Sequence, residues 1–242
     1  MPKKKTRKIV SVFRILLLFS VLANIAVIIY FLLINKDSDI DVISLYSKNF
    51  EYAFFALVSL ALTFGPGIVK KRQIIYIPYT LEIVIIVFIY AGIFLSVRYN
   101  LYYTFWWWDN LLHFFSGIII GFIGVIVIYK INSKFSMAIS PLLVAFFSFT
   151  FAVTMGVFWE ILEFTGDVIM GTAHQKWNLP DDAVLLGKIY QGSGLRDTMS
   201  DLILNCIGAF ITSIIAYQMC KKESFQNKIK DIVDKNNSRK IL

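Results

Sequence analysis

The sequence predicts an all-α fold, a polytopic bundle of about six transmembrane helices. Of the 242 residues, 57% are hydrophobic and 17% are charged, whereas a soluble domain carries about a quarter charged residues. The apolar residues fall in blocks of roughly 20 residues, which is the length that crosses the hydrocarbon core of a bilayer. Because no water is present there to satisfy the backbone, we expect these blocks to be helices.

The apolar blocks define the domain organisation. The six predicted spans are residues 15–34, about 52–69, 76–97, 106–129, 139 to about 170, and 202–219. We therefore expect a six-helix transmembrane domain at 15–219, between a basic N-terminal tail at 1–14 and a basic C-terminal tail at 220–242. Its one sizeable extramembrane segment is the extracytoplasmic loop at about 171–196.

The ends of the blocks support each assignment in turn. The first block resembles a signal peptide, but it is too long and no small-residue cleavage site follows it, so we interpret it as a retained anchor. The second block ends at a basic segment, residues 70–75, and the third follows that segment. The fourth starts at three tryptophans, 106–108, which are typical of an interfacial aromatic belt. The fifth is long, and the polar loop at 171–196 separates it from the sixth.

The basic residues predict the orientation. With the N-terminus inside, the cytoplasmic segments 1–14, 70–75, 130–138 and 220–242 hold 18 of the 24 Lys and Arg residues. Cytoplasmic loops of membrane proteins carry such an excess. We therefore expect a multi-pass protein of the bacterial plasma membrane with both termini in the cytoplasm. Membrane lipids are the expected partners, because the basic ends face anionic headgroups, and the net charge of +8 requires no nucleic acid.

Ionisable residues gather at the extracytoplasmic ends of the last three spans. They are Asp109 and His113 in the fourth span, Glu160, Glu163 and Asp167 in the fifth, and Asp197, Asp201 and Asn205 at the start of the sixth. Spacings of three and four place the members of each group on one helix face. A charge at membrane depth costs a few kcal/mol on insertion scales, so these side chains should turn inward and meet.

Small residues on two of these helices favour close packing. Gly117, Gly121 and Gly124 lie on the fourth span, and Gly208 and Ala209 lie on the sixth. Glycine and alanine allow helix backbones to approach closely in a membrane. We therefore expect these positions to supply surfaces for close helix contact.

A simpler interpretation of the charges is also open. Acids at helix ends often only mark the interface, and a first-turn acid is stabilised by the helix dipole. Asp167 and Asp197 fit that explanation as well as they fit a site. His113, Glu160 and Asn205 lie deeper and fit it less well. The loop at 171–196 is either a plain connector or a lid over the cluster, with Arg196 able to pair a carboxylate or an anionic headgroup.

Three motifs carry a family resemblance. They occupy residues 107–117 (WWDNLLHFFSG), 159–171 (WEILEFTGDVIMG) and 197–209 (DTMSDLILNCIGA). In this order they resemble the YjdF-type family of bacterial membrane proteins, with a distant likeness to VanZ-like proteins, over about 78–209. VanZ-like proteins are associated with glycopeptide-antibiotic tolerance. The resemblance implies a membrane fold with this polar cluster and assigns no reaction.

The cluster supports several functions. One is an enzyme acting on a lipid or lipid-linked envelope substrate, with a divalent metal ion that activates water. We expect His113, Glu160 and Asp201 as metal ligands, with Asp109 orienting His113. A carboxylate network that shares protons without a metal is equally compatible with the residues. The remaining alternatives are a small transporter, a lipid-handling protein and a non-catalytic accessory protein.

Each candidate residue has an expected role. The candidate catalytic residues are Asp109, His113, Glu160, Glu163 and Asp201, and the candidate binding residues are Asp167, Arg196, Asp197 and Asn205. The two cysteines, Cys206 and Cys220, lie too far apart on one helix to form a disulfide, because fourteen residues of helix span about 21 Å.

Overall fold

The computed structural model describes residues 3–34, 40–72, 74–135, 139–178 and 192–222. Within these ranges the regular structure is entirely helical, and six helices are long and apolar enough to cross a membrane. These six are Lys4–Leu33, Leu45–Lys71, Tyr79–Arg98, Trp108–Asn132, Pro141–Ile169 and Ser193–Cys220. The predicted fold class and the number of spans are confirmed.

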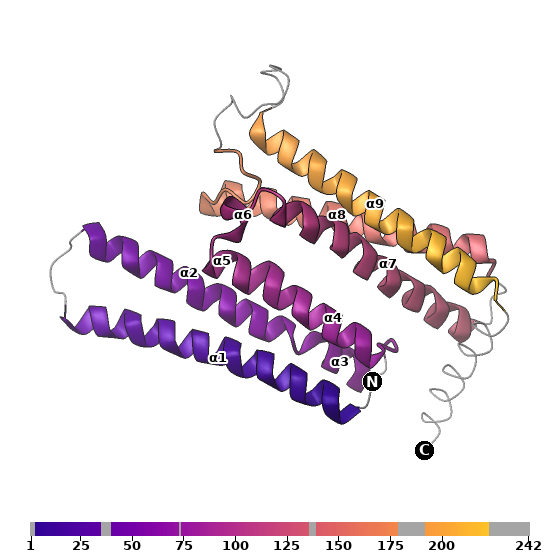
Figure 1. Cartoon of the computed structure of the whole chain (residues 1–242), viewed down its shortest axis with the longest axis horizontal. Coiled ribbons are helices and arrows are strands. Elements are labelled where there is room, and N and C mark those ends of the chain that lie inside the picture. The colour runs from indigo at the N-terminus through magenta and orange to yellow at the C-terminus, as the bar shows by residue number, and fades with distance from the viewer. Residues whose placement is uncertain (1–2, 35–39, 73, 136–138, 179–191, 223–242) are drawn as a thin grey trace. The chain divides into compact units, whose positions relative to one another are not determined.

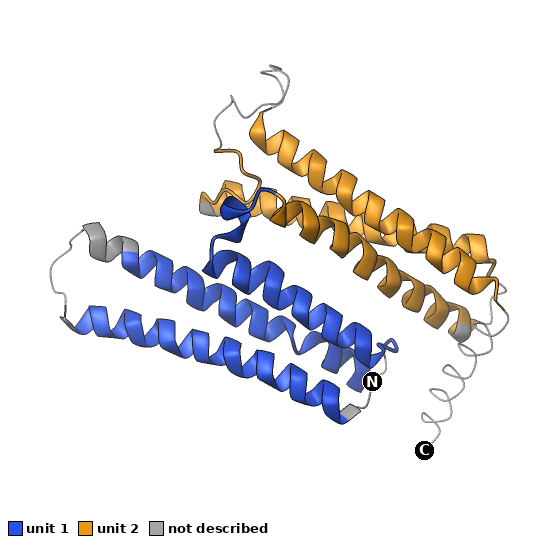
Figure 2. Cartoon of the chain, in the orientation of Figure 1, with its two compact units in different colours: residues 1–106 blue, residues 107–242 orange. Residues whose placement is uncertain are grey.

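The chain forms two compact units, residues 1–106 and residues 107–242, which Figure 2 shows in blue and orange. Hydropathy gives no indication of this division, since both units consist of similar apolar helices. Many large apolar side chains are exposed in each unit, for example Phe19 and Leu33 in the first and Val168 and Ile169 in the second. Such broad exposure is unusual in a water-soluble monomer and is expected where lipid is the solvent.

The first unit contains the helices α1 to α6. Their bounds are α1 Lys3–Ile34, α2 Ile40–Leu62, α3 Gly65–Lys71, α4 Tyr79–Ile89, the π-helix η1 Tyr90–Leu95, α5 Ser96–Arg98 and α6 Leu101–Thr104. Helix α1 begins at Lys3, so the basic residues that we expected in a tail at 1–14 form its first turns. Lysine and arginine are good helix formers, which allows the helix to extend beyond the apolar block.

The second predicted span is broken into α2 and α3 at a junction that Arg14 braces. Pro66 lies in the first turn of α3, where its missing N–H is tolerated. The Arg14 side chain donates from Nε to Thr63 Oγ1 at 3.1 Å and from Nη2 to the Thr63 carbonyl at 2.8 Å. The same guanidinium lies 4.0 Å from the centre of the Phe64 ring. A small core of Leu17, Val21, Ala56 and Phe94 holds this unit together.

The second unit consists of three long helices that pack against one another, α7 Trp108–Phe135, α8 Pro141–Met170 and α9 Ser193–Cys220 (Figure 1). Ser140 caps α8 by accepting a hydrogen bond from the Leu143 N–H, and Gly171 ends it with a positive φ of 66°. Helix α9 begins nine residues before the predicted start at 202. The prediction was too late because the first turns of the helix are polar, and a prediction from hydropathy does not include them in the span.

Direct backbone contact joins α7 and α9. A Cβ atom at Gly208 would lie 2.1 Å from the Phe114 carbonyl oxygen, and one at Gly117 would lie 2.2 Å from the Asn205 carbonyl oxygen. Only glycine permits this separation, so the predicted close contact through small residues is confirmed. The contact fixes the two helices at the level of the polar residues that lie about one turn away.

Candidate functional site

His113 is the centre of a buried polar cluster to which three helices contribute. Its Nε2 atom lies 3.4 Å from Asp109 Oδ1, one turn earlier on α7, and 3.8 Å from Asp201 Oδ2 on α9. Its Nδ1 atom lies 3.7 Å from Glu160 Oε1 on α8. All four residues are buried, with exposed fractions of 7% or less. The prediction that α7, α8 and α9 bring these four side chains together is confirmed.

Two of these acids have buried oxygen atoms that lack a hydrogen-bond donor. Among the residues that the structure describes, neither carboxylate oxygen of Asp201 has a hydrogen-bond donor, and Glu160 has none of normal geometry, although the Thr198 hydroxyl approaches it. Asp201 is completely buried, and Glu160 is 5% exposed. An ionised carboxylate in such surroundings is costly unless a charge or a hydrogen bond compensates it. The cluster therefore needs a bound cation or additional protons.

A lysine of the segment after α8 reaches into the same cluster. Lys176 Nζ donates to Asp109 Oδ2 at 2.5 Å and to Asp197 Oδ1 at 2.6 Å. Burial by itself lowers the pKa of Lys176, but the two carboxylates raise it above its ordinary value, so this ammonium group stays charged. Sequence reasoning placed Lys176 among the extracytoplasmic basic residues and missed this role. The available signal was the excess of acidic residues at one membrane face. Such an excess needs a positive charge nearby, and the adjoining loop carries basic residues.

Asp167 holds the loop rather than facing His113. Its Oδ1 atom accepts hydrogen bonds from Thr172 Oγ1 at 2.7 Å and from the His174 N–H at 2.8 Å, and its Oδ2 atom accepts one from the Gln175 N–H at 3.0 Å. These local donors are the nearest partners for a carboxylate in the last turn of α8. Asp167 thus anchors the segment that carries Lys176, and its binding role stays a prediction.

Glu163 and Asn205 lie at the edges of the cluster, and Glu163 interacts electrostatically with Glu160, Asp109 and His113. Glu163 is half-buried and accepts a hydrogen bond at 2.7 Å from the indole N–H of Trp159, one turn earlier on α8. Asn205 Nδ2 donates to Ser116 Oγ at 3.1 Å, and Ser116 Oγ donates to the His113 carbonyl at 2.7 Å. Asn205 therefore links α9 to α7 through Ser116.

The remaining predicted residues lie at the start of α9. Asp197 is half-buried and accepts the Lys176 hydrogen bond, so it extends the cluster beyond Asp109. Arg196 lies in the first turn of α9 and is half-buried. Helix α9 thus carries Asp197 and Asp201 on one stripe toward the cluster, as the spacing of four predicts.

Asp109, His113 and Asp201 form the set that best fits a metal ion. One donor atom from each lies within 4.8 Å of the other two. Donor atoms that share a tetrahedral ion at about 2.1 Å lie about 3.4 Å apart, so the separations of 3.4 and 3.8 Å from His113 Nε2 need little adjustment.

The ring geometry places the acids on different sides of His113. We expected Glu160 as a ligand and Asp109 as the residue that orients His113. Asp109 instead shares the Nε2 side of the ring with Asp201, whereas Glu160 faces Nδ1. Because the two ring nitrogens point in different directions, one ion cannot easily use both sides. Glu160 lies 3.7 Å from Nδ1, beyond hydrogen-bonding distance, whereas Asp109 lies 3.4 Å from Nε2, so Asp109 makes the closer contact with the ring.

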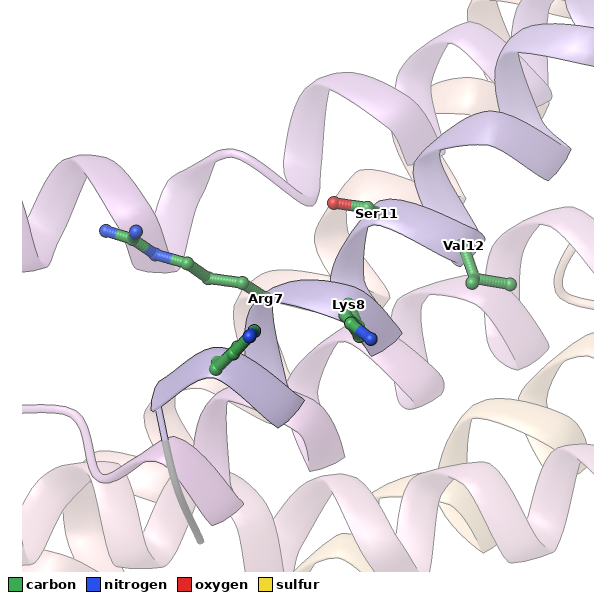
Figure 3. A pocket seen from close by; sticks show the side chains of 5 residues that line it. Arg7, Lys8, Ser11 and Val12 are labelled. Atoms are coloured by element: carbon green, nitrogen blue, oxygen red, sulfur yellow. The ribbon is translucent and has the colours of Figure 1, made fainter.

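The first unit carries a separate basic surface. An open depression on the first turns of α1 is lined by Lys4, Arg7, Lys8, Ser11 and Val12 (Figure 3). The three cationic side chains are exposed.

Comparison with known proteins places the chain in a family. A model of predicted membrane proteins, DUF2238, matches residues 15–222. A protein of Thermotoga maritima described as an uncharacterized protein is 31% identical over 119 residues, which are 49% of this chain and 52% of the relative. The chain thus spans about half the length of that relative. No solved structure gave a significant match.

The family match covers all three motifs and is consistent with the expected YjdF-type resemblance, while the likeness to VanZ-like proteins stays a prediction. The matched region includes every residue of the cluster described above. The chain therefore belongs to the DUF2238 family of predicted membrane proteins.

Proposed function

We propose that the second unit is a divalent-cation centre that activates water for a reaction on a lipid or lipid-linked envelope substrate. The observation that carries this proposal is Asp201, which is fully buried beside His113 with both oxygens lacking a hydrogen-bond donor in the described part of the chain. A cation between Asp109, His113 and Asp201 supplies the missing partner.

The charge balance favours an ion with two positive charges. Three carboxylates, those of Asp109, Glu160 and Asp201, lie beside His113, a fourth, that of Asp197, joins the cluster through Lys176, and Lys176 contributes one fixed positive charge. A histidine that binds metal is neutral, which leaves an excess of three negative charges. In surroundings of low polarity this excess is costly, and a divalent ion removes more of it than a monovalent one.

The residue types determine the chemistry that the ion provides. Carboxylates with one imidazole suit magnesium, manganese or zinc. Such an ion lowers the pKa of a bound water and supplies a nucleophile at neutral pH. Glu160, 3.7 Å from the opposite ring nitrogen, adds a negative charge beside His113. Since the cluster lies within three membrane-spanning helices whose outer faces are apolar, a substrate with a lipid chain is the expected kind.

We further infer that the cluster lies at the extracytoplasmic side of a bacterial plasma membrane and that both termini are cytoplasmic, from the distribution of basic residues. Reporter fusions at Lys36 and Lys188, which lie outside the described residues, should be extracytoplasmic. A fusion at Lys71 should be cytoplasmic. A cytoplasmic signal at Lys188 would contradict the orientation.

Thermal unfolding in detergent tests the cation site. Micromolar Mn²⁺ or Zn²⁺ added to chelator-treated protein should raise the melting temperature, because a ligand that binds only the folded state stabilises it. The rise should vanish in Asp201→Asn and His113→Ala. Glu82→Gln is the matched control, since Glu82 is a membrane-span acid of the first unit that pairs with Lys70. It should keep the full response.

A proton-sharing carboxylate network is the second candidate, and the same unpartnered oxygens of Glu160 and Asp201 favour it. It fits a transporter or lipid-handling protein, in which membrane acids carry protons. In that case the melting temperature depends on pH and does not change when a divalent cation or a chelator is added. That result would overturn the metal proposal.

The depression on α1 fits an anionic lipid headgroup. Lys4, Arg7 and Lys8 are exposed together beside Ser11 at the start of a membrane-spanning helix. Basic groups near the cytoplasmic leaflet are attracted to anionic lipids by about 1 kcal/mol each. Changing all three to glutamine should weaken binding of the detergent-purified protein to spin-labelled phosphatidylglycerol and leave binding of phosphatidylcholine unchanged.

A further inference from the structure

One carboxylate is shared between the candidate metal site and a lysine. Asp109 faces His113 with Oδ1, at 3.4 Å from Nε2, and accepts a hydrogen bond from Lys176 with Oδ2 at 2.5 Å. The ammonium group also lies 2.6 Å from Asp197 Oδ1. It therefore occupies a position between two acids of the cluster where a free cation would otherwise lie.

The loop holds this lysine in a specific position. Residues 174 and 175 are fixed by their backbone N–H groups to Asp167, and Gln175 Nε2 donates to Thr198 Oγ1 at 2.8 Å. Lys176 itself has a positive φ of 49°, which a side chain with a Cβ rarely adopts. Such strain persists only where surrounding contacts impose it. The contacts of the loop and the ion pairs of the ammonium group together impose it here.

We propose that Lys176 is a specificity-determining residue that competes with the bound cation for Asp109 and restricts the site to ions with at least two charges. This inference rests on the proposed cation site. A monovalent ion offers Asp109 no more charge than the tethered ammonium does, and the tether gives the lysine a high effective concentration. A divalent ion gains His113 and Asp201 as additional ligands and has twice the charge. It therefore displaces Lys176, which then remains paired with Asp197.

Cation titrations of Lys176→Met and of the wild type in detergent test the proposal. Removal of the competitor should tighten Mn²⁺ binding on the order of tenfold, the effect of one partly buried charge interaction. It should also introduce a response of the melting temperature to K⁺. Lys176→Arg, which keeps the charge, should show no K⁺ response. Lys71→Met, at an exposed lysine of the first unit, should bind Mn²⁺ as the wild type does.

The outcomes separate this inference from the proposed function. If neither the wild type nor Lys176→Met binds Mn²⁺, the cation site is wrong. If both bind it equally, or if Lys176→Met binds it more weakly, the site stands and the competition is wrong. Should Lys176→Met fail to fold, trypsin cleavage of the wild type after Lys176 gives the answer. Mn²⁺ should accelerate that cleavage by releasing the side chain from Asp109, one of its two partners, and an unchanged rate would overturn the proposal.

Discussion

Replacement of Gly208 by alanine should separate α7 from α9 and lower stability. The new Cβ atom would lie 2.1 Å from the Phe114 carbonyl oxygen and 3.2 Å from the Ile118 nitrogen, both of which belong to backbone. A carbon and an oxygen need about 3.2 Å, so the helices must move apart by about 1 Å, and overpacking of this kind costs about 3 kcal/mol. Alanine regains about 1 kcal/mol of helix propensity. The expected net loss is about 2 kcal/mol.

Thermal unfolding of purified protein in detergent measures this loss. At about 3 °C per kcal/mol, the melting temperature of Gly208→Ala should fall by about 6 °C. Gly67→Ala is the control, because a Cβ there meets no atom within 4 Å. Gly124→Ala should be intermediate, since its Cβ meets the Phe151 side chain at 3.2 Å. A Gly208→Ala protein as stable as Gly67→Ala would refute the backbone contact between α7 and α9.

Three further substitutions test other parts of the structure. Asp201→Asn should raise the melting temperature of chelator-treated protein, because it removes a buried charge that has no hydrogen-bond donor. A lower melting temperature would show that other groups compensate the charge of Asp201. Asp167→Asn should weaken the loop anchor, and faster trypsin cleavage after Lys176 is the expected readout. Arg14→Gln should cost about 2 kcal/mol in a thermal melt, because it removes hydrogen bonds from a charged donor. The exposed Arg7→Gln should be neutral within about 0.5 kcal/mol.

The packing of α7, α8 and α9 was predictable in part from residue spacing. Asp109 and His113 are four residues apart, as are Asp197 and Asp201, so each pair shares a helix face in any α-helix. The cost of charge in lipid then turns these faces inward. Glycines at 117 and 208 indicated surfaces for close helix contact. These inferences depend only on local periodicity and on the solvent, and the described structure agrees with them.

The roles of individual acids could not be predicted in the same way. Asp167 and Glu163 share the inward stripe of α8 with Glu160, yet Asp167 bonds to the loop and Glu163 to Trp159. A carboxylate bonds to the donors that its side-chain rotamer can reach. The loop donors at 174 and 175 follow no periodic pattern, so the spacing of residues could not predict them. The side of the imidazole that each acid faces depends on the rotation of each helix about its axis, which spacing leaves open.

The sequence by itself determined that the chain is a membrane protein with six apolar helices and that its acids gather at one end of three of them. Both properties follow from composition and period, because lipid requires internally bonded helices and penalises exposed charge. Only the tertiary structure decided that Asp109 and Asp201 flank one nitrogen of His113, that Glu160 faces the other, and that Lys176 enters the cluster. Those contacts join residues up to 88 positions apart, and their geometry is fixed by helix rotation and by the path of a short loop.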